Sequence, residues 1–168
     1  MAIFRQPLKP CESLTRMTPD IRKIILSLSA AGLIAIASHE AYSPKPYVDL
    51  AGIWTNGFGN THNVTPNKGV TVPQALDQLN TNSLEAQAAV TNCITKPLTQ
   101  SQFDAFVDFT FNVGSSAFCH STVVKKFNAG DVAGSCGELL RWVYAGGKVQ
   151  PGLVKRRNDE YKLCMEGL

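Results

Sequence analysis

The longest apolar stretch of the sequence runs from residue 24 to residue 38 and reads IILSLSAAGLIAIAS. Arg22 and Lys23 precede it, and Glu40 is the first carboxylate after it. Its 15 residues are fewer than the roughly 20 that a membrane-spanning helix needs, and serine, alanine and glycine dilute its apolar character. We therefore favour a buried core helix, alone or combined with a weak uncleaved membrane anchor, over a signal peptide cleaved near Ala37.

A β-hairpin is predicted directly after this stretch. Tyr47 and Val48, and then residues 53–55, have the aromatic and β-branched composition of strands. Residues 49–52 read as the turn between them, and Gly57 and Gly59 continue a loop-rich region.

The remainder of the chain has helical periodicity, which is clearest over residues 98–114. Thr99 and Gln102 have the spacing of a capping box, and Gly114 ends the pattern. The apolar face of this helix consists of Phe103, Phe106, Val107 and Phe111. Further helices are predicted over residues 72–90, 121–128, 131–143 and 151–165. The predicted fold class is therefore α+β, with a small β-hairpin lobe, a larger helical lobe and an active-site cleft between them.

Composition narrows the function classes. The chain has 168 residues, 44% of them apolar, which is enough for one domain with a sizeable core. Its net charge of +3 is small and scattered, whereas nucleic-acid binding needs a concentrated basic face. The three histidines do not have zinc-site spacing. We accordingly predict no nucleic-acid partner, no metal ion and no cofactor.

Four of the five cysteines lie in the second half of the chain, and two disulfides formed in an oxidising compartment are preferred over buried free thiols. Three pairings are open. We favour Cys119–Cys136 together with Cys93–Cys164, which leaves Cys11 unpaired.

Glu40 and Asp49 are the residues with the strongest indication of chemistry. Glu40 follows an apolar helix, and desolvation there favours the protonated carboxyl, while Asp49 falls on a polar turn where it stays ionised. Two carboxyl groups in opposite protonation states are what glycosidic bond cleavage requires. Thr55, on the returning strand, could hold a water molecule beside Asp49. The alternative is an ordinary solvated surface.

The frame E-(x)8-D-(x)5-T that these three residues form resembles the catalytic triad of the phage-type lysozymes, glycoside hydrolase family 24. Four longer segments are similar to the family in the same order, and together they cover about residues 30–165. They read KPYVDLAGIWTNGFGNT, LTQSQFDAFVDFTFNVG, STVVKKFNAGD and LLRWVYAGGKVQPGLVKRRNDEY. One departure is Asn60, which stands where many members of the family carry histidine.

The resemblance implies a muramidase that hydrolyses the β-1,4 bond between N-acetylmuramic acid and N-acetylglucosamine of peptidoglycan. It implies that Glu40 is the general acid, that Asp49 and Thr55 position the attacking water, and that the anomeric carbon is inverted. Inversion needs about 6.5–9.5 Å between the two carboxyl groups. The family also implies an arginine beside the catalytic glutamate, a role open to Arg157 or Arg156. Asn112 is a predicted contact of the substrate cleft.

Some phage lysozymes use their first helix as a signal-arrest-release anchor, and residues 21–39 resemble that device. The predicted organisation is an N-terminal arm over residues 1–20, this apolar helix over residues 21–39, and a monomeric catalytic domain over residues 40–168. The enzyme would associate transiently with the inner membrane and then work in the host periplasm. Without an anchor, it would stay in the cytoplasm until a holin acts.

Two other functions compete with this reading. A lytic transglycosylase cuts the same bond with a glutamate, but it has no need of a water held by Asp49 and Thr55. A non-catalytic wall-binding or membrane-disrupting module would rely on the apolar helix and the basic C-terminal region instead. A non-catalytic module would tolerate loss of the Glu40 charge, whereas an enzyme that uses Glu40 would not.

Overall fold

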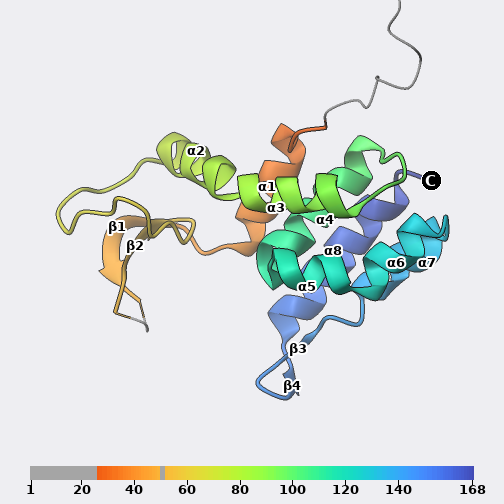
Figure 1. Ribbon diagram of the computed structural model, residues 1–168. Helices are drawn as coiled ribbons and strands as arrows, with labels where there is room; N and C mark the ends of the chain where they lie inside the picture. Colours follow the sequence, from red (N-terminus) through yellow and green to blue (C-terminus); the bar gives the residue numbers. More distant parts are fainter. Residues whose placement is uncertain (1–25, 50–51) are drawn as a thin grey trace, which may run out of the picture.

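The computed structural model describes residues 26–49 and 52–168. The predicted arm over residues 1–20, the leftover Cys11 and the basic pair at residues 22–23 lie outside this part of the chain. Within it, the β1–β2 hairpin lies at one end, helices gather at the other, and α2 and α3 run between them (Figure 1). The predicted α+β arrangement of a small hairpin lobe and a larger helical lobe is confirmed.

The first helix, α1 (Ala30–His39), begins later than the apolar run that predicted it. The reason is Ser29, which caps the helix by accepting a hydrogen bond from Gly32 N at 3.0 Å. Ser29 also donates from its backbone N and its Oγ to the buried carboxylate of Asp104, at 3.0 and 2.5 Å. A Cβ on Gly32 would lie 2.6 Å from Asp104 Cγ, so glycine allows α1 to approach this helix closely.

The predicted hairpin is confirmed. Strand β1 (Ser43–Val48) pairs antiparallel with β2 (Trp54–Gly57), and the register sets Tyr47 opposite Thr55 and Val48 opposite Trp54. The sheet holds Asn60 through an isolated bridge to Asn56. Asn60 is buried, and its side chain accepts a hydrogen bond from Asn82 Nδ2 at 3.2 Å, so an amide links this loop to the next helix.

The helix predicted over residues 72–90 is two helices, α2 (Val72–Asn82) and α3 (Leu84–Cys93). The break falls at Ser83, whose fully buried hydroxyl donates to the carbonyl of Asn80 at 2.7 Å. Serine competes for backbone groups in this way and therefore weakens a helix interior. The break lets α2 pack against β2 in the hairpin lobe while α3 packs in the helical lobe.

The centre of the helical lobe is α4 (Gln100–Val113), which has the predicted Thr99–Gln102 capping box and ends at Gly114 with φ +88°. Residues 102–110 are all buried, because α1, α3, α5 and α8 pack around this helix. Phe109 is consequently as buried as Phe103 and Phe106, although it lies off the predicted apolar face. A helix enclosed on all sides has no solvent-exposed face along the enclosed stretch.

The later elements are α5 (Ser115–His120), α6 (Thr122–Asn128), α7 (Val132–Leu139), strands β3 (Tyr144–Ala145) and β4 (Lys148–Val149), and α8 (Pro151–Met165). The predictions for α6 and α8 are confirmed, but α5 was missed and α7 is shorter than predicted. The chain instead forms a second hairpin whose turn is Gly146-Gly147, both with positive φ. Two glycines between short strands are a hairpin signal that the sequence contained.

Two disulfides are present, so the prediction that these four cysteines are oxidised is confirmed, but the favoured pairing was wrong. The bonds are Cys93–Cys119 and Cys136–Cys164. The first joins α3 to α5, and the second joins α7 to α8. These helix pairs pack directly on one another, and that contact decides the pairing.

Removing either disulfide should lower the free energy of unfolding by about 3.5 kcal/mol, because both close loops of similar length. Cys136 and Cys164 are fully buried, whereas Cys93 and Cys119 are only partly buried. The Cys136→Ser/Cys164→Ser pair should therefore cost more than Cys93→Ser/Cys119→Ser, since it also buries two hydroxyls. Urea denaturation of both double variants measures the difference, and equal losses would contradict the contribution from burial.

Candidate active site

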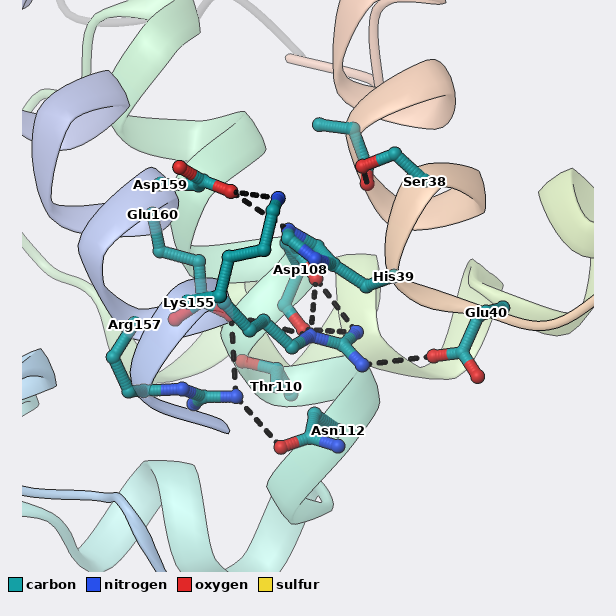
Figure 2. Close-up of polar contacts among 12 residues, drawn as sticks. Ser38, His39, Glu40, Asp108, Thr110, Asn112, Lys155, Arg157, Asp159 and Glu160 are labelled. Carbon is teal, nitrogen blue, oxygen red and sulfur yellow. Dashed lines mark hydrogen bonds and ion pairs between the residues drawn. The ribbon is translucent and has the colours of Figure 1, made fainter. Parts of the chain in front are cut away.

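Glu40 occupies the junction between the two lobes, as the C-cap of α1 just before β1. Its backbone leaves the helical conformation, at φ −101° and ψ 140°, which turns the chain toward the hairpin. The side chain is 28% exposed, and its Oε1 accepts a hydrogen bond from Arg156 Nη1 at 2.8 Å (Figure 2). The sequence predicted apolar neighbours for this carboxyl group, but the contact that the structure gives it is ionic.

Arg156, on α8, is almost completely buried. Its Nε and Nη2 donate to Asp108 Oδ1 at 2.9 and 2.6 Å, and Nη2 also donates to the Asp108 carbonyl at 3.3 Å. Burial opposes the charge on this guanidinium, but the negative charges of Asp108 and Glu40 outweigh that effect and raise the pKa of Arg156. The side chain is thus a permanent cation shared between two carboxylates.

Of the two arginines predicted to orient Glu40, the structure brings Arg156 to it and directs Arg157 elsewhere. Arg157 Nη2 donates to Asn112 Oδ1 at 2.6 Å, and its guanidinium lies 4.8 Å from the centre of the Phe109 ring. Adjacent residues on a helix point about 100° apart, so only one of the two can face Glu40. Asn112, the predicted cleft contact, is exposed in the last turn of α4 beside Arg157.

Asp108 is the functional candidate that the sequence reasoning missed. It lies on α4, is 2% exposed, and faces Arg156 on one side and His39 Nε2 at 3.6 Å on the other. Burial raises the pKa of Asp108, while Arg156 and His39 act to lower it. A carboxylate among phenylalanines on an apolar helix was the available signal, because a buried carboxylate needs a partner.

His39 lies directly before Glu40, but its Nε2 faces the carboxylates of Asp108 and Asp159, at 3.6 and 3.9 Å (Figure 2). Burial is the largest influence on this ring and lowers the pKa of His39 below its usual range. The neutral imidazole is therefore favoured near pH 7. This placement fits a packed side chain on the side of Asp108 that faces away from Arg156.

Asp49 and Thr55 both lie on the β1–β2 hairpin. The Oδ1 of Asp49 accepts a hydrogen bond from Ile53 N at 2.9 Å, which closes the turn around the carboxylate. Thr55 is opposite Tyr47, and Asp49 comes two residues after Tyr47. Thr55 therefore lies on β2, and Asp49 lies directly after the end of β1 on the same hairpin.

Glu160 lies beside Arg156 and Arg157 and makes the stability of the protein depend on pH. It is 0% exposed, and its Oε1 lies 3.3 Å from Arg157 Nη2 and 3.4 Å from Arg156 Nε. Burial first, and then the negative charge of Asp108, raise the pKa of Glu160 well above its ordinary value of 4.5. The folded protein therefore keeps a proton here that the unfolded chain releases as the pH rises through that value.

We expect the free energy of unfolding to fall as pH rises from about 4.5 toward the raised pKa of Glu160, and Glu160→Gln to remove this slope. Glu138→Gln is the matched control with the opposite sign, because a hydrogen bond from Lys126 lowers the pKa of Glu138. The stability that Glu138 contributes is present above its unfolded pKa and lost as pH falls. Urea midpoints between pH 4 and pH 9 measure both, and parallel curves for wild type and Glu160→Gln would contradict the assignment.

The sequence matches the model of the family described as phage lysozyme over residues 37–160. An endolysin of Acyrthosiphon pisum secondary endosymbiont phage 1 is 39% identical over 82% of this chain and 97% of its own length. A SAR-endolysin of Bacteriophage PS119 is 32% identical over 90% of this chain and 98% of its own length.

Solved structures agree in fold. The muramidase domain of SpmX from Asticaccaulis excentricus has a TM-score of 0.77 and 33% identity, covering 83% of this chain and 98% of that one. The active form of the P1 phage endolysin Lyz has a TM-score of 0.72 with 30% identity, over 83% and 85% of the two chains. The secreted inactive form of the same endolysin scores 0.53 with 26% identity, over 83% and 96%. The present structure is therefore more similar to the form described as active.

The family match, the endolysin relatives and the solved structures together show an enzyme of the lysozyme class. The chain belongs to the phage lysozyme family.

Proposed function

We propose that this protein is an endolysin that hydrolyses the β-1,4 bond between N-acetylmuramic acid and N-acetylglucosamine of peptidoglycan during host-cell lysis. The observation that carries the proposal is the setting of Glu40. One of its oxygens is fixed by Arg156, while the side chain remains 28% exposed at the lobe junction. A general acid must be both oriented and reachable by its substrate.

In this mechanism Glu40 donates a proton to the glycosidic oxygen as the bond breaks, and positive charge develops on the sugar ring. Asp49 and Thr55 hold a water molecule for attack on the anomeric carbon from the opposite face. Their place on the same hairpin, Asp49 directly after β1 and Thr55 on β2, supports that role, because a water molecule needs both a base and a second polar contact to be aligned. The reaction then inverts the anomeric carbon.

The test is to digest purified Gram-negative peptidoglycan with the protein and to weigh the released muropeptides. Hydrated muramic acid at the reducing ends is the expected product, and its α-anomer should appear first if the reaction inverts. Fragments one water lighter, with anhydro ends, would make the protein a transglycosylase and leave Asp49 without its role. A failure to release fragments would favour the non-catalytic wall-binding module.

We further propose that residues 21–39 tether the enzyme to the inner membrane before release to the periplasm, as the name of its SAR-endolysin relatives suggests. Among the helices that the structure describes, none is both long and apolar enough to cross a membrane. The disulfides support a final location in an oxidising compartment. The exposed faces of Ala30 and Ala31 leave room for a direct test of the tether.

Replacing Ala30 and Ala31 by leucine should increase the membrane-bound fraction and delay lysis by raising the apolarity of the segment. Gly32 must be left unchanged, because any side chain there meets Asp104 and would disturb folding for an unrelated reason. Fractionation of induced cells and a lysis curve measure the effect, with Ala30→Ser/Ala31→Ser as the control that should shift both in the opposite direction. Unchanged partitioning in both variants would contradict the tether.

A further inference from the structure

The geometry points to Asp108 as a positioning residue for Glu40. Through Arg156 it fixes the orientation of Glu40, and its negative charge offsets part of the positive charge that Arg156 brings to the site. This inference rests on the proposed function, in which Glu40 is the general acid. Asp108 itself lies beneath the site and acts only through the arginine.

The first line of argument is geometric. Asp108 takes two guanidinium nitrogens of Arg156, Nε and Nη2, and leaves Nη1 to Glu40 Oε1. A guanidinium is a rigid planar fork, so holding one edge of it on Asp108 sets the direction in which Nη1 points. Glu40 alone could not fix a long arginine side chain through a single hydrogen bond.

The second line concerns rigidity. Asp108 belongs to the most buried stretch of α4, whereas Glu40 lies at the end of α1 where the chain leaves the helix. The contacts therefore join the centre of the core to the proposed acid by way of α8. A catalytic group that is held from a rigid element keeps its geometry better than one held from a loop.

The third line concerns charge. If Arg156 had Glu40 as its sole anionic partner, the cation would favour the ionised carboxylate, which cannot donate a proton. Asp108, at 2.6 Å from Nη2, places a second negative charge against Arg156, so Glu40 is not the sole anionic partner of this cation.

Other ionisable groups face this pair and must be included in any pH-dependent interpretation. His39 comes from α1, and α8 contributes Lys155, Arg157, Asp159 and Glu160. His39, the nearest of them on the far side of Asp108, is favoured in its neutral form near pH 7. Asp108 and Glu40 are the two acids whose carboxylates accept hydrogen bonds from the Arg156 guanidinium.

The test is Asp108→Asn, because the amide oxygen can still accept both hydrogen bonds from Arg156 while the negative charge is lost. We expect kcat to fall between about tenfold and a hundredfold with little change in KM, less than the loss of the acid itself. The alkaline limb of the pH–activity profile should move to lower pH. Asp108→Ala, which removes the hydrogen bonds as well, should lower kcat further.

Asp104→Asn is the matched control. Asp104 lies one turn earlier on the same helix and is equally buried, but it binds Ser29 and Gln100 instead of Arg156. It should lower the melting temperature without moving the pH profile. A folded Asp108→Asn variant with the kcat and pH profile of the wild type would overturn the inference, as would an identical pH profile in both variants. Failure of the proposed function is distinguishable, because then Glu40→Gln would keep its activity or the wild type would release no hydrated muropeptides.

Discussion

Glu40→Gln should retain the fold and lose its peptidoglycan-hydrolysing activity by about 10²–10⁴-fold, the usual contribution of a general acid. The glutamine oxygen can still accept the hydrogen bond that Arg156 Nη1 gives to Glu40 Oε1. The missing property is the proton, which an amide cannot donate. Turbidity loss of a cell-wall suspension measures the activity, and a melting curve verifies the fold.

Glu85→Gln is a suitable comparison, because Glu85 is exposed on α3 and accepts a hydrogen bond from Ser115 that glutamine can also accept. It should keep wild-type activity. If Glu40→Gln remained active, both the proposed acid and the hydrolytic mechanism would have to be abandoned. A hydrolase that uses another acid would give that result, whereas a wall-binding module would not clear the suspension even as the wild type.

Arg156→Met is the single substitution with the largest expected effect on stability, a loss of about 3–5 kcal/mol in the free energy of unfolding. Methionine fills much of the same space, but it leaves the buried carboxylate of Asp108 without its cation. Burial already raises the pKa of Asp108, and Arg156 is the largest influence that lowers it. Without Arg156, the pKa of Asp108 should therefore rise further. The Arg156→Met variant thus keeps its stability below the unfolded pKa of Asp108, near 3.8. It loses that stability as pH rises through the pKa that Asp108 has in the folded protein.

The measurement is urea denaturation of Arg156→Met at pH 4 and pH 7, with the larger loss expected at pH 7. Adding Asp108→Asn should restore part of the stability, because the buried charge is then gone as well. Arg141→Met is the matched control. Its side chain is 75% exposed and pairs with Glu138, so its removal should cost no more than about 1 kcal/mol. Equal losses at Arg156 and Arg141 would contradict the importance of the buried network.

Local sequence determined the parts of this protein that depend on neighbouring residues. The capping box at Thr99 defined the start of α4, and Pro151 and the helix formers after it defined α8. The strand-forming residues on the two sides of the predicted turn determined the hairpin that carries Asp49 and Thr55. Each of these signals acts within a few residues, so it can be read without knowing the fold.

Tertiary structure decided what depends on contacts between distant segments. Ser29 ends the extended segment before α1 because Asp104, 75 residues later, receives its hydrogen bonds. The cysteines pair as they do because α3 meets α5 and α7 meets α8. Arg156 faces Glu40, and Arg157 faces Asn112, because α8 packs on α4 in one rotation about its axis. Sequence alone thus supplied the chemical groups, and helix packing selected which of them meet.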